Sequence, residues 1–428
     1  MLIKPPSIFY GWWNVLAGFV GMGLSYAMFT IFVFGTLVEP LQSEFGWSRV
    51  QLSYALSLTN IAIVIASPFI GFVIDKIGVR HTVIPSLILM GGSVASMVFL
   101  SGNIWYFYAL FFLIPFLGAG TLPQSYSRVL IAWFARRRGI ALGISLSGFG
   151  VGAALIPYIS QLVIDNYGWR AAYLCFTCAI FFISLPVMFL LLRESPKDMG
   201  LYPDGTINGI EQNSSLASIS DPKAGLVTTR AIKTKNFWLL LSSFLLVGIG
   251  ITSVVAHLVP MLTDRGIEPH VAASSMTALG IGLILGRIIA GYLMDIFFAP
   301  YVTAGFILGL FVAILILATG TNSQLVFVAA VLVGLATGSE ISEIAYMCSR
   351  YFGQKAFALI YGLMFAAFQL GSSIGAPLLG SYFDAHGNYI EALQIVAAIV
   401  FVAIILILNL GPYPTNSEFT QNDQFRSK

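Results

Sequence analysis

The chain contains 428 residues, of which 58% are hydrophobic and only 9% are charged. Soluble globular proteins carry about 25% charged residues, so this composition excludes a soluble protein and predicts an integral membrane protein. The formal net charge of +3 gives no reason to expect a nucleic-acid partner.

Twelve apolar segments follow one another along the chain, and each can cross a bilayer as a helix of about 20 residues. They lie near residues 11–38, 51–74, 82–101, 104–134, 137–164, 169–193, 236–262, 271–295, 301–320, 324–352, 355–383 and 389–410. The turns between them are short, except for a polar stretch without apolar periodicity in the middle of the chain. We predict an all-α membrane protein with 12 transmembrane helices in two pseudo-symmetric six-helix bundles. The expected parts are an N-terminal bundle, a cytoplasmic linker, a C-terminal bundle and a cytoplasmic tail, at 1–193, 194–235, 236–410 and 411–428.

The positions of the lysines and arginines predict the orientation of these helices. Most of the 21 basic residues fall in loops and tails on the side of the membrane that carries both termini. The loops on the other side hold only Arg49, Arg170 and Arg265. Because cytoplasmic loops are enriched in Lys and Arg, we expect both termini and the linker to be cytoplasmic, in the cell (inner) membrane. The remaining two, Arg128 and Arg287, lie within predicted spans.

Two patterns occur once in each half of the chain. The stretch Gly71–Asp75 (GFVID) ends the second span as Gly291–Asp295 (GYLMD) ends the eighth. The residues Trp133–Arg138 (WFARRR) before the fifth span have a counterpart in Arg350–Lys355 (RYFGQK) before the eleventh. Two parallel halves of this kind form a substrate site between them, near the membrane midplane.

The loop Gly71–Arg80 (GFVIDKIGVR) resembles the signature of the major facilitator superfamily between spans two and three. Gly71 permits close contact between helices, Asp75 faces helix ends and basic groups, and Arg80 supplies a counter-charge. We expect this loop to act as a cytoplasmic latch, a contact that stabilises one conformation and does not touch substrate. The second-half copy keeps Gly291 and Asp295 but lacks the later Gly and Arg, so we expect a weaker latch there.

The arginine corner, Arg136, Arg137 and Arg138, is expected to hold the cytoplasmic surface as part of the same latch. Arginines this concentrated do not enter hydrocarbon. The helix that follows opens with small residues, which allow close approach to a neighbouring helix.

Within that superfamily, the chain is similar over nearly all its spans to bacterial members of the monocarboxylate transporter family. The related oxalate–formate exchangers share many of the same motifs. These are Tyr10–Trp13 (YGWW), Phe45–Arg49 (FGWSR), the arginine corner, Tyr167–Arg170 (YGWR), His257–Pro260 (HLVP), Gly338–Glu340 (GSE) and Ser349–Gly353 (SRYFG). The resemblance implies a secondary transporter of small organic anions, often coupled to protons.

Arg287 is the first candidate for substrate binding. A charge at the bilayer centre costs about 2.5–3.5 kcal/mol on insertion scales, so Arg287 must face protein or water. Its guanidinium offers a planar fork that matches a carboxylate. The alternative is a purely structural ion pair. Many family members carry an aspartate four residues earlier, where this chain has Leu283, so another acid would have to carry the proton here.

Glu340 and Glu343 are the candidate proton carriers. They lie midway through the tenth span, three residues apart and therefore on one helix face. Burial and a neighbouring carboxylate both favour the protonated form of a carboxylic acid. The alternative is that one of the two only neutralises Arg287 or Arg128.

Further candidates for the substrate site are polar or aromatic residues within the spans. Gln124 and Tyr126 of span four could donate hydrogen bonds to a carboxylate, and Tyr346 and Tyr361 are similar candidates, although each is equally suited to packing. His257, near the outer end of span seven, is suited to gating, proton relay or a structural role. The remaining basic residue within a span, Arg128, is expected to extend its side chain to the surface.

Several absences narrow the function further. Lys355 stands only at the cytoplasmic start of span eleven, and a single buried arginine favours a monoanion over a dicarboxylate. We find no nucleotide-binding loop, metal cluster or catalytic triad, so we expect no cofactor, no metal, no ATP and no enzymatic activity. The expected partners are a small organic anion, protons and the lipid bilayer, with the protein as a monomer. Organic-anion exchange and export of other small molecules remain as alternatives. A membrane enzyme would need clustered acids or histidines that face the lipid headgroups. A receptor would need a soluble output domain, and the linker and tail are too short and polar for one.

Overall fold

The computed structural model describes residues 9–205, 225–319 and 323–414. This part of the chain holds 12 helical segments long and apolar enough to cross a membrane, which confirms the predicted all-α fold. Eight spans are single helices: α3 (Arg49–Ile77), α7 (Arg138–Tyr167), α12 (Lys235–Asp264), α13 (Pro269–Ile296), α14 (Ala299–Thr319), α15 (Ser323–Tyr351), α16 (Phe357–His386) and α17 (Ile390–Leu408).

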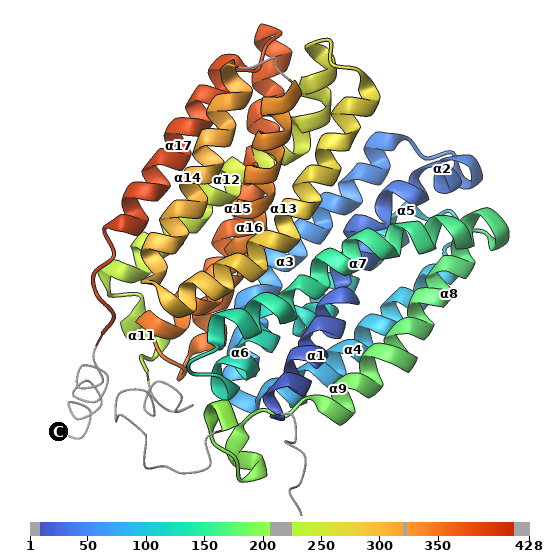
Figure 1. Cartoon of the computed structure of the whole chain (residues 1–428). Coiled ribbons are helices and arrows are strands. Elements are labelled where there is room, and N and C mark those ends of the chain that lie inside the picture. Colours follow the sequence, from blue (N-terminus) through green and yellow to red (C-terminus); the bar gives the residue numbers. More distant parts are fainter. Residues whose placement is uncertain (1–8, 206–224, 320–322, 415–428) are drawn as a thin grey trace, which may run out of the picture.

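The helices form two bundles that stand side by side, the first six spans in one and the last six in the other (Figure 1). The described chain ends, Phe9 and Pro414, lie at the same end of the molecule, which we call the terminal side. The bundles contact each other through α3 against α16 and α7 against α13. They diverge toward the other end, the opposite side (Figure 1).

The first span is broken, although the sequence suggested one continuous segment. It consists of α1 (Gly11–Gly23), a π-helical turn (Met28–Phe32) and α2 (Phe34–Phe45). Leu24 leaves the helical conformation at φ −120° and ψ 34°. Interrupted spans are common around transporter binding sites, because they free backbone groups inside the membrane.

The fourth span is broken for a reason visible in the sequence. It consists of α5 (Ile104–Leu117), a 3-10 turn (Gly118–Thr121) and α6 (Pro123–Trp133). A proline disfavours the helical conformation in the residue before it. Leu122, which precedes Pro123, is accordingly extended, with φ −66° and ψ 153°.

Two more spans of the N-terminal bundle are composite. The third is α4 (Val79–Ser96) followed by a 3-10 turn (Met97–Phe99), and the sixth joins α8 (Trp169–Ala179) to α9 (Leu185–Leu191) through a π-helical turn (Ile180–Ser184). Short helical turns at Pro196–Met199 and Pro203–Gly205, and α11 (Thr228–Ala231), flank the central linker. Residues 206–224 of the predicted linker and 415–428 of the predicted tail lie outside the described residues.

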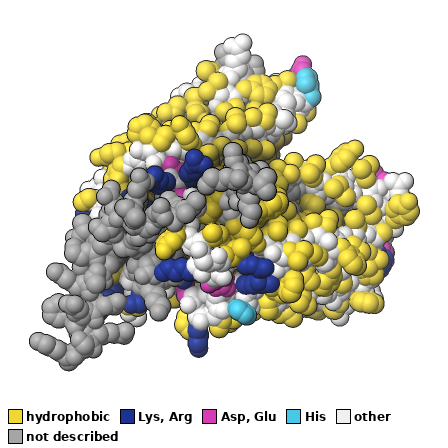
Figure 2. Space-filling model, turned by 60° about the horizontal axis from the view of Figure 1, so that its bottom comes forward, with side chains coloured by type: hydrophobic (Ala, Val, Ile, Leu, Met, Phe, Trp, Pro, Cys, Tyr) yellow, Lys and Arg dark blue, Asp and Glu magenta, His cyan; other side chains and the backbone are white. Residues whose placement is uncertain are grey.

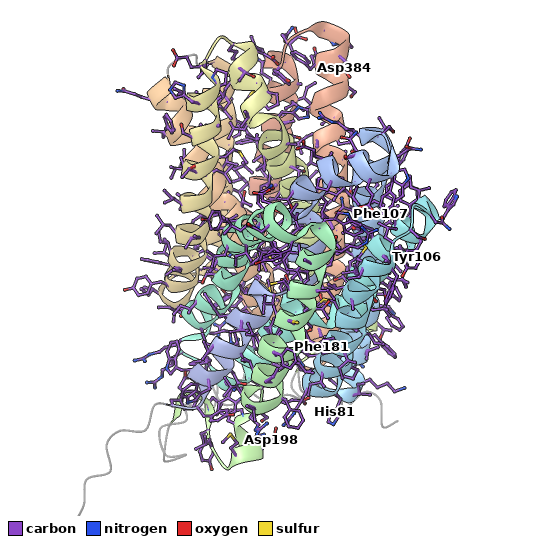
Figure 3. The ribbon with its side chains drawn as sticks, turned by 90° about the vertical axis from the view of Figure 1, so that its right-hand side faces the viewer. His81, Tyr106, Phe107, Phe181, Asp198 and Asp384 are labelled. Carbon is purple, nitrogen blue, oxygen red and sulfur yellow. The ribbon has the colours of Figure 1, made fainter. Side chains whose placement is uncertain are left out.

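The surface follows the membrane prediction. Apolar side chains cover the sides of the helices, and lysines and arginines gather on the terminal side, which faces the viewer in Figure 2. Exposed basic residues on this side include Lys76, Arg136, Arg137, Lys197 and Lys233. In Figure 3, His81 and Asp198 mark the terminal side and Asp384 marks the opposite side.

Candidate functional site

Helices α7 and α13 meet across the two bundles through glycines. A Cβ on Gly139 would lie 2.9 Å from the carbonyl carbon of Gly291, and a Cβ on Gly143 would lie 3.2 Å from that of Arg287. Glycine lets helix backbones approach this closely because it has no side chain. The α7–α13 contact therefore has no space for even one added methyl group.

Helices α3 and α16 form a second close contact between the bundles. A Cβ on Gly71 would lie 2.7 Å from the carbonyl carbon of Ala358, and a Cβ on Gly362 would lie 2.9 Å from that of Ser67. The Ser67 hydroxyl also lies 3.1 Å from the Gly362 carbonyl oxygen. Both contacts lie toward the terminal side, where α3 ends and α16 begins, so the molecule is closed on this side.

Two carboxylates bridge the bundles by capping helices of the other half. Asp75 accepts hydrogen bonds from the backbone N–H groups of Ala358 (3.2 Å) and Leu359 (2.9 Å) at the start of α16. Asp295 accepts hydrogen bonds from the backbone N–H groups of Gly139 (2.7 Å) and Ile140 (3.0 Å) at the start of α7. A carboxylate is favourable at a helix N-terminus, where unpaired N–H groups carry partial positive charge. We expected a weaker second latch, but both carboxylates make the same pair of hydrogen bonds.

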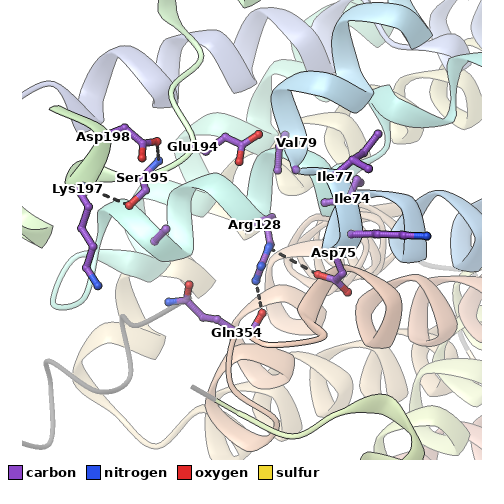
Figure 4. A pocket seen from close by; sticks show the side chains of 13 residues that line it. Ile74, Asp75, Ile77, Val79, Arg128, Glu194, Ser195, Lys197, Asp198 and Gln354 are labelled. Atoms are coloured by element: carbon purple, nitrogen blue, oxygen red, sulfur yellow. Dashed lines mark hydrogen bonds and ion pairs between the residues drawn. The ribbon is translucent and has the colours of Figure 1, made fainter. Parts of the chain in front are cut away.

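The counter-charge of Asp75 comes from Arg128, not from Arg80 as the sequence suggested. The Arg128 Nε lies 3.6 Å from the Asp75 carboxylate, and Arg128 also donates a hydrogen bond to the carbonyl of Gln354 (Figure 4). Arg80 instead donates to the carbonyl of Phe189 at 2.8 Å and covers the Phe189 ring. The sequence misled because Arg80 is close along the chain, whereas span four brings Arg128 to Asp75 in space.

A cavity of about 780 Å³ opens beside this ion pair on the terminal side. Its lining is mixed in charge and comes from both bundles, as Figure 4 shows. It includes Asp75, Lys76, Arg128, Glu194, Lys197, Asp198 and Gln354. The cavity therefore belongs to the latch region, by which we mean the surroundings of Asp75 and Asp295 on the terminal side. It does not lie in the part of the membrane where Arg287 lies.

The arginine corner divides into two exposed residues and one buried one. Arg136 and Arg137 are exposed as expected, but Arg138 is only 1% exposed. Its guanidinium donates to the Ser349 hydroxyl across the bundles at 3.0 Å and to the Phe134 carbonyl at 3.2 Å. The surface position predicted for Arg138 is wrong, because the first turn of α7 turns this side chain into the contact between the bundles.

Asp204 attaches the start of the linker to this corner. Its carboxylate accepts hydrogen bonds from the N–H groups of Ala135 (3.0 Å) and Arg136 (2.9 Å). Its backbone is left-handed, with φ 58°, a conformation that Asp tolerates better than most residues. Asp204 was not predictable from the sequence, because nothing local marks a linker aspartate as a partner of a loop nearly 70 residues earlier.

Arg287 lies at the contact between the bundles and is 1% exposed. Its guanidinium donates to the Gly338 carbonyl of α15 at 3.2 Å and to the Leu146 carbonyl of α7. The ring of Phe149, also on α7, lies 5.2 Å from its Cζ atom. Arg287 therefore connects three helices of the two bundles, and its partners are neutral groups.

The two acids of α15 are buried and face different surroundings. Glu340 interacts electrostatically with Arg287 and Tyr361, although it forms no ion pair with Arg287. The polar neighbours of Glu343 are Ser339 of its own helix and Thr303 of α14. Each acid is 2% exposed and has one carboxyl oxygen without a hydrogen-bond partner. The structure thus brings Glu340 and Tyr361 to Arg287 and directs Glu343 toward α14.

The two candidates of span four have neighbours other than Arg287. Gln124 is bound at both ends of its amide to Ser67, by a bond of 2.7 Å to the Ser67 carbonyl and one of 3.0 Å from the Ser67 hydroxyl. The Tyr126 hydroxyl faces Gly21 of α1 and Met188 of α9, inside the N-terminal bundle, and has no hydrogen-bond partner.

Tyr346 and His257 also lie apart from Arg287. The charged neighbours of Tyr346 are Arg138, Arg350 and Asp295, which places it in the latch region. The His257 ring lies 2.9 Å from the carbonyl oxygen of Ala376, toward the opposite end of α12. Of the six predicted substrate-site residues, only Tyr361 accompanies Arg287. The described residues include no group of three or more His, Cys, Asp or Glu suited to a metal ion.

Two bundles of six membrane helices, closed at one end around capping carboxylates and a buried arginine, define a membrane transporter. The chain belongs to the Major Facilitator Superfamily, whose family model matches residues 18–298 and 240–427. This confirms the resemblance read from Gly71–Arg80.

Curated relatives are named as monocarboxylate transporters. Monocarboxylate transporter 11 of Homo sapiens is 26% identical over 423 residues, covering 95% of this chain and 84% of the relative. Monocarboxylate transporter 12 of Mus musculus is 24% identical over 430 residues, covering 95% of this chain and 86% of the relative. The similarity to monocarboxylate transporters is therefore confirmed, whereas the bacterial branch and the oxalate–formate exchangers stay predictions.

Solved structures show the same fold. The transporter FucP in the outward conformation matches with a TM-score of 0.66 and 18% identity, covering 92% of this chain and 97% of that one. The proton:xylose symporter XylE bound to 6-bromo-6-deoxy-D-glucose matches with a TM-score of 0.72 and 14% identity, covering 95% and 97%.

Proposed function

We propose that this protein transports a small organic monocarboxylate together with a proton by alternating access. The observation that carries the proposal is Arg287, which is buried between the bundles beside Glu340 without forming an ion pair with it. The names of the relatives support the substrate class.

Arg287 is proposed as the anchor of the substrate carboxylate. In the closed arrangement its guanidinium donates to two carbonyl oxygens, which are weaker partners for a cation than a carboxylate. One of them, the Leu146 carbonyl, belongs to the other bundle. A substrate carboxylate that replaces it links substrate binding to the contact between the bundles.

Glu340 is proposed as the proton carrier. An ionised Glu340 and the substrate carboxylate compete for the same guanidinium, so protonation of Glu340 favours substrate binding to Arg287. One proton and one monoanion then cross together, and the step is electroneutral. Glu343, three residues further along α15, interacts electrostatically with Glu340 and is proposed to support it.

Tyr361 is proposed to assist at the same place. Its hydroxyl donates to the Ile341 carbonyl at 3.3 Å and lies near both Glu340 and Arg287. Gln124, Tyr126, Tyr346 and His257 have other neighbours here and are not included in the proposed site.

The orientation and organisation follow from the basic residues. We propose that the terminal side is cytoplasmic and that the protein is a monomer in the cell membrane, with the two bundles at 1–193 and 236–410. The conformation described above is then outward-facing, with Gly71, Asp75, Asp295 and the arginine corner closing the cytoplasmic side. Transport requires these contacts to separate.

The test of the site is binding of labelled L-lactate by the purified protein. Arg287→Lys keeps the positive charge but loses the planar guanidinium that can form two hydrogen bonds to a carboxylate. Losing a hydrogen bond to a charged group costs about 1.5–3 kcal/mol. The affinity of this variant for lactate should therefore fall about 10- to 150-fold. Methyl lactate and lactamide should not compete. The matched control is Arg170→Lys, since Arg170 binds Glu44 and two carbonyls at the opposite side, far from the site. Equal competition by the neutral analogues, or normal binding by Arg287→Lys, would contradict the proposal.

A further inference from the structure

Phe149 occupies a distinctive place beside the proposed anion site. Its ring centroid lies 5.2 Å from the Arg287 Cζ atom, and it packs edge-to-face with the Phe32 ring at a centroid distance of 5.5 Å and an interplanar angle of 78°. Phe149 and Phe32 are half-buried, whereas Arg287 is fully buried. The aromatic pair therefore lines one side of the guanidinium.

Phe32 reaches this position because of the π-helical turn in the first span. Phe29 of the same turn points the other way, into the N-terminal bundle, where it is fully buried against Phe176 at 5.3 Å. A π-helical turn changes the direction of side chains relative to an α-helix, and such turns are frequent at functional sites. The turn thus supplies one aromatic ring to the core and one to the Arg287 region.

Glycines bring this turn close enough to α7 for the rings to touch. A Cβ on Gly148 would lie 2.7 Å from the carbonyl carbon of Phe19, and a Cβ on Gly152 would lie 2.9 Å from both the Gly23 Cα and the Met28 sulfur. This close approach fixes the distance between the first span and α7. Phe149 lies between these two glycines, and its ring packs against Phe32 of the turn.

We propose that Phe149, backed by Phe32, is a specificity-determining wall of the Arg287 site that admits carboxylates with narrow tails and excludes wide ones. The inference rests on the proposed function, since it takes Arg287 as the carboxylate anchor. A carboxylate pairs with the edge of a guanidinium, in its plane, and the Phe149 ring centroid lies 5.2 Å from the Cζ atom of that group. In the proposed site, substituents on the carbon next to the carboxylate extend toward the Phe149 ring. Branching at that carbon meets this ring, which packs against Phe32.

The test compares ligands of different width within each variant. Propionate, trimethylacetate and benzoate are titrated against the purified full-length protein, and half-saturating concentrations are measured by thermal shift. For the wild-type protein we expect propionate to bind at least about tenfold more tightly than trimethylacetate. In Phe149→Ala this ratio should fall by about tenfold or more, the size expected when a pocket gains room for one or two carbons. Phe149→Leu keeps much of the bulk and should retain most of the ratio.

The control is Phe182→Ala, which removes an aromatic ring from the other π-helical turn, where Phe182 is 77% exposed. Its ratio should equal that of the wild-type protein. Because each ratio is internal to one variant, a loss of stability does not affect it. An unchanged ratio in Phe149→Ala, or a wild-type protein that binds all three acids equally, would contradict the proposed role of Phe149. Either result would leave Arg287 as the proposed anchor of the carboxylate. A wild-type protein that binds none of the acids would overturn the proposed function as well.

Discussion

The contact between α7 and α13 gives the most specific prediction, because one methyl group is enough to disturb it. A Cβ on Gly139 would overlap the carbonyl oxygen of Gly291 and lie 2.9 Å from its carbonyl carbon. The neighbouring atoms are helix backbone, which cannot move aside as a side chain can. Gly139→Ala should therefore force the two bundles apart on the terminal side.

The size of the effect follows from the packing. Overfilling a well-packed contact costs about 1–3 kcal/mol. Alanine also favours a helix over glycine by about 1 kcal/mol, but that gain applies in both conformations if α7 moves as a rigid helix. The difference between conformations is then the packing cost alone. It lowers the ratio of closed to open molecules on the terminal side by about 5- to 150-fold.

Distances between spin labels measure this shift directly. One label pair, at residues Arg137 and Phe297, reports the terminal side, and a second, at Tyr167 and His270, reports the opposite side; all four are exposed. The three native cysteines are first replaced by alanine. In Gly139→Ala we expect longer distances for the first pair and shorter distances for the second.

Gly280→Ala is the matched control. Gly280 lies on α13, like Gly291, but a Cβ there meets nothing within 4 Å. Its distance distributions should match those of the unsubstituted protein. If Gly139→Ala leaves both label pairs unchanged, or shifts them no more than Gly280→Ala, the closed glycine contact does not control the conformation.

Two further predictions concern the terminal side. A cysteine at Arg137 should be protected from an impermeant maleimide in intact cells while a cysteine at Tyr167 is labelled; the reverse pattern would invert the proposed orientation. Asp204→Ala should speed hydrogen exchange of the Ala135 and Arg136 amides by about 10- to 150-fold, since each loses a hydrogen bond to a charged group worth about 1.5–3 kcal/mol. Unchanged exchange at these two amides would show that Asp204 does not hold the corner.

The fold was predictable because membrane spans are marked by length and hydropathy alone. All twelve predicted segments correspond to helical spans, and the break in span four is also visible in the sequence as Gly118–Pro123 (GAGTLP). The break in span one is harder to foresee. Leu24 carries no proline signal, and the π-helical turn Met28–Phe32 has no local sequence marker.

The candidate site was only partly predictable, because it depends on contacts between distant segments. Arg287 and Glu340 stand out in the sequence as charges inside spans, and the structure brings them together. The partner of Asp75 was not predictable from spacing, since Arg128 comes from another span. Phe149 carries no signal in the sequence, because one phenylalanine among 34 is marked only by its contact with Arg287.

The central claim, proton-coupled monocarboxylate transport through Arg287 and Glu340, is tested most directly by accumulation of labelled L-lactate in proteoliposomes. The membrane potential is clamped at zero and a pH gradient is imposed, acidic outside. We predict accumulation by the wild-type protein, and loss of accumulation in Glu340→Gln with exchange of internal for external lactate preserved. Accumulation that survives in the Glu340→Gln, Glu343→Gln double variant, or that requires a membrane potential instead of a pH gradient, would contradict the account.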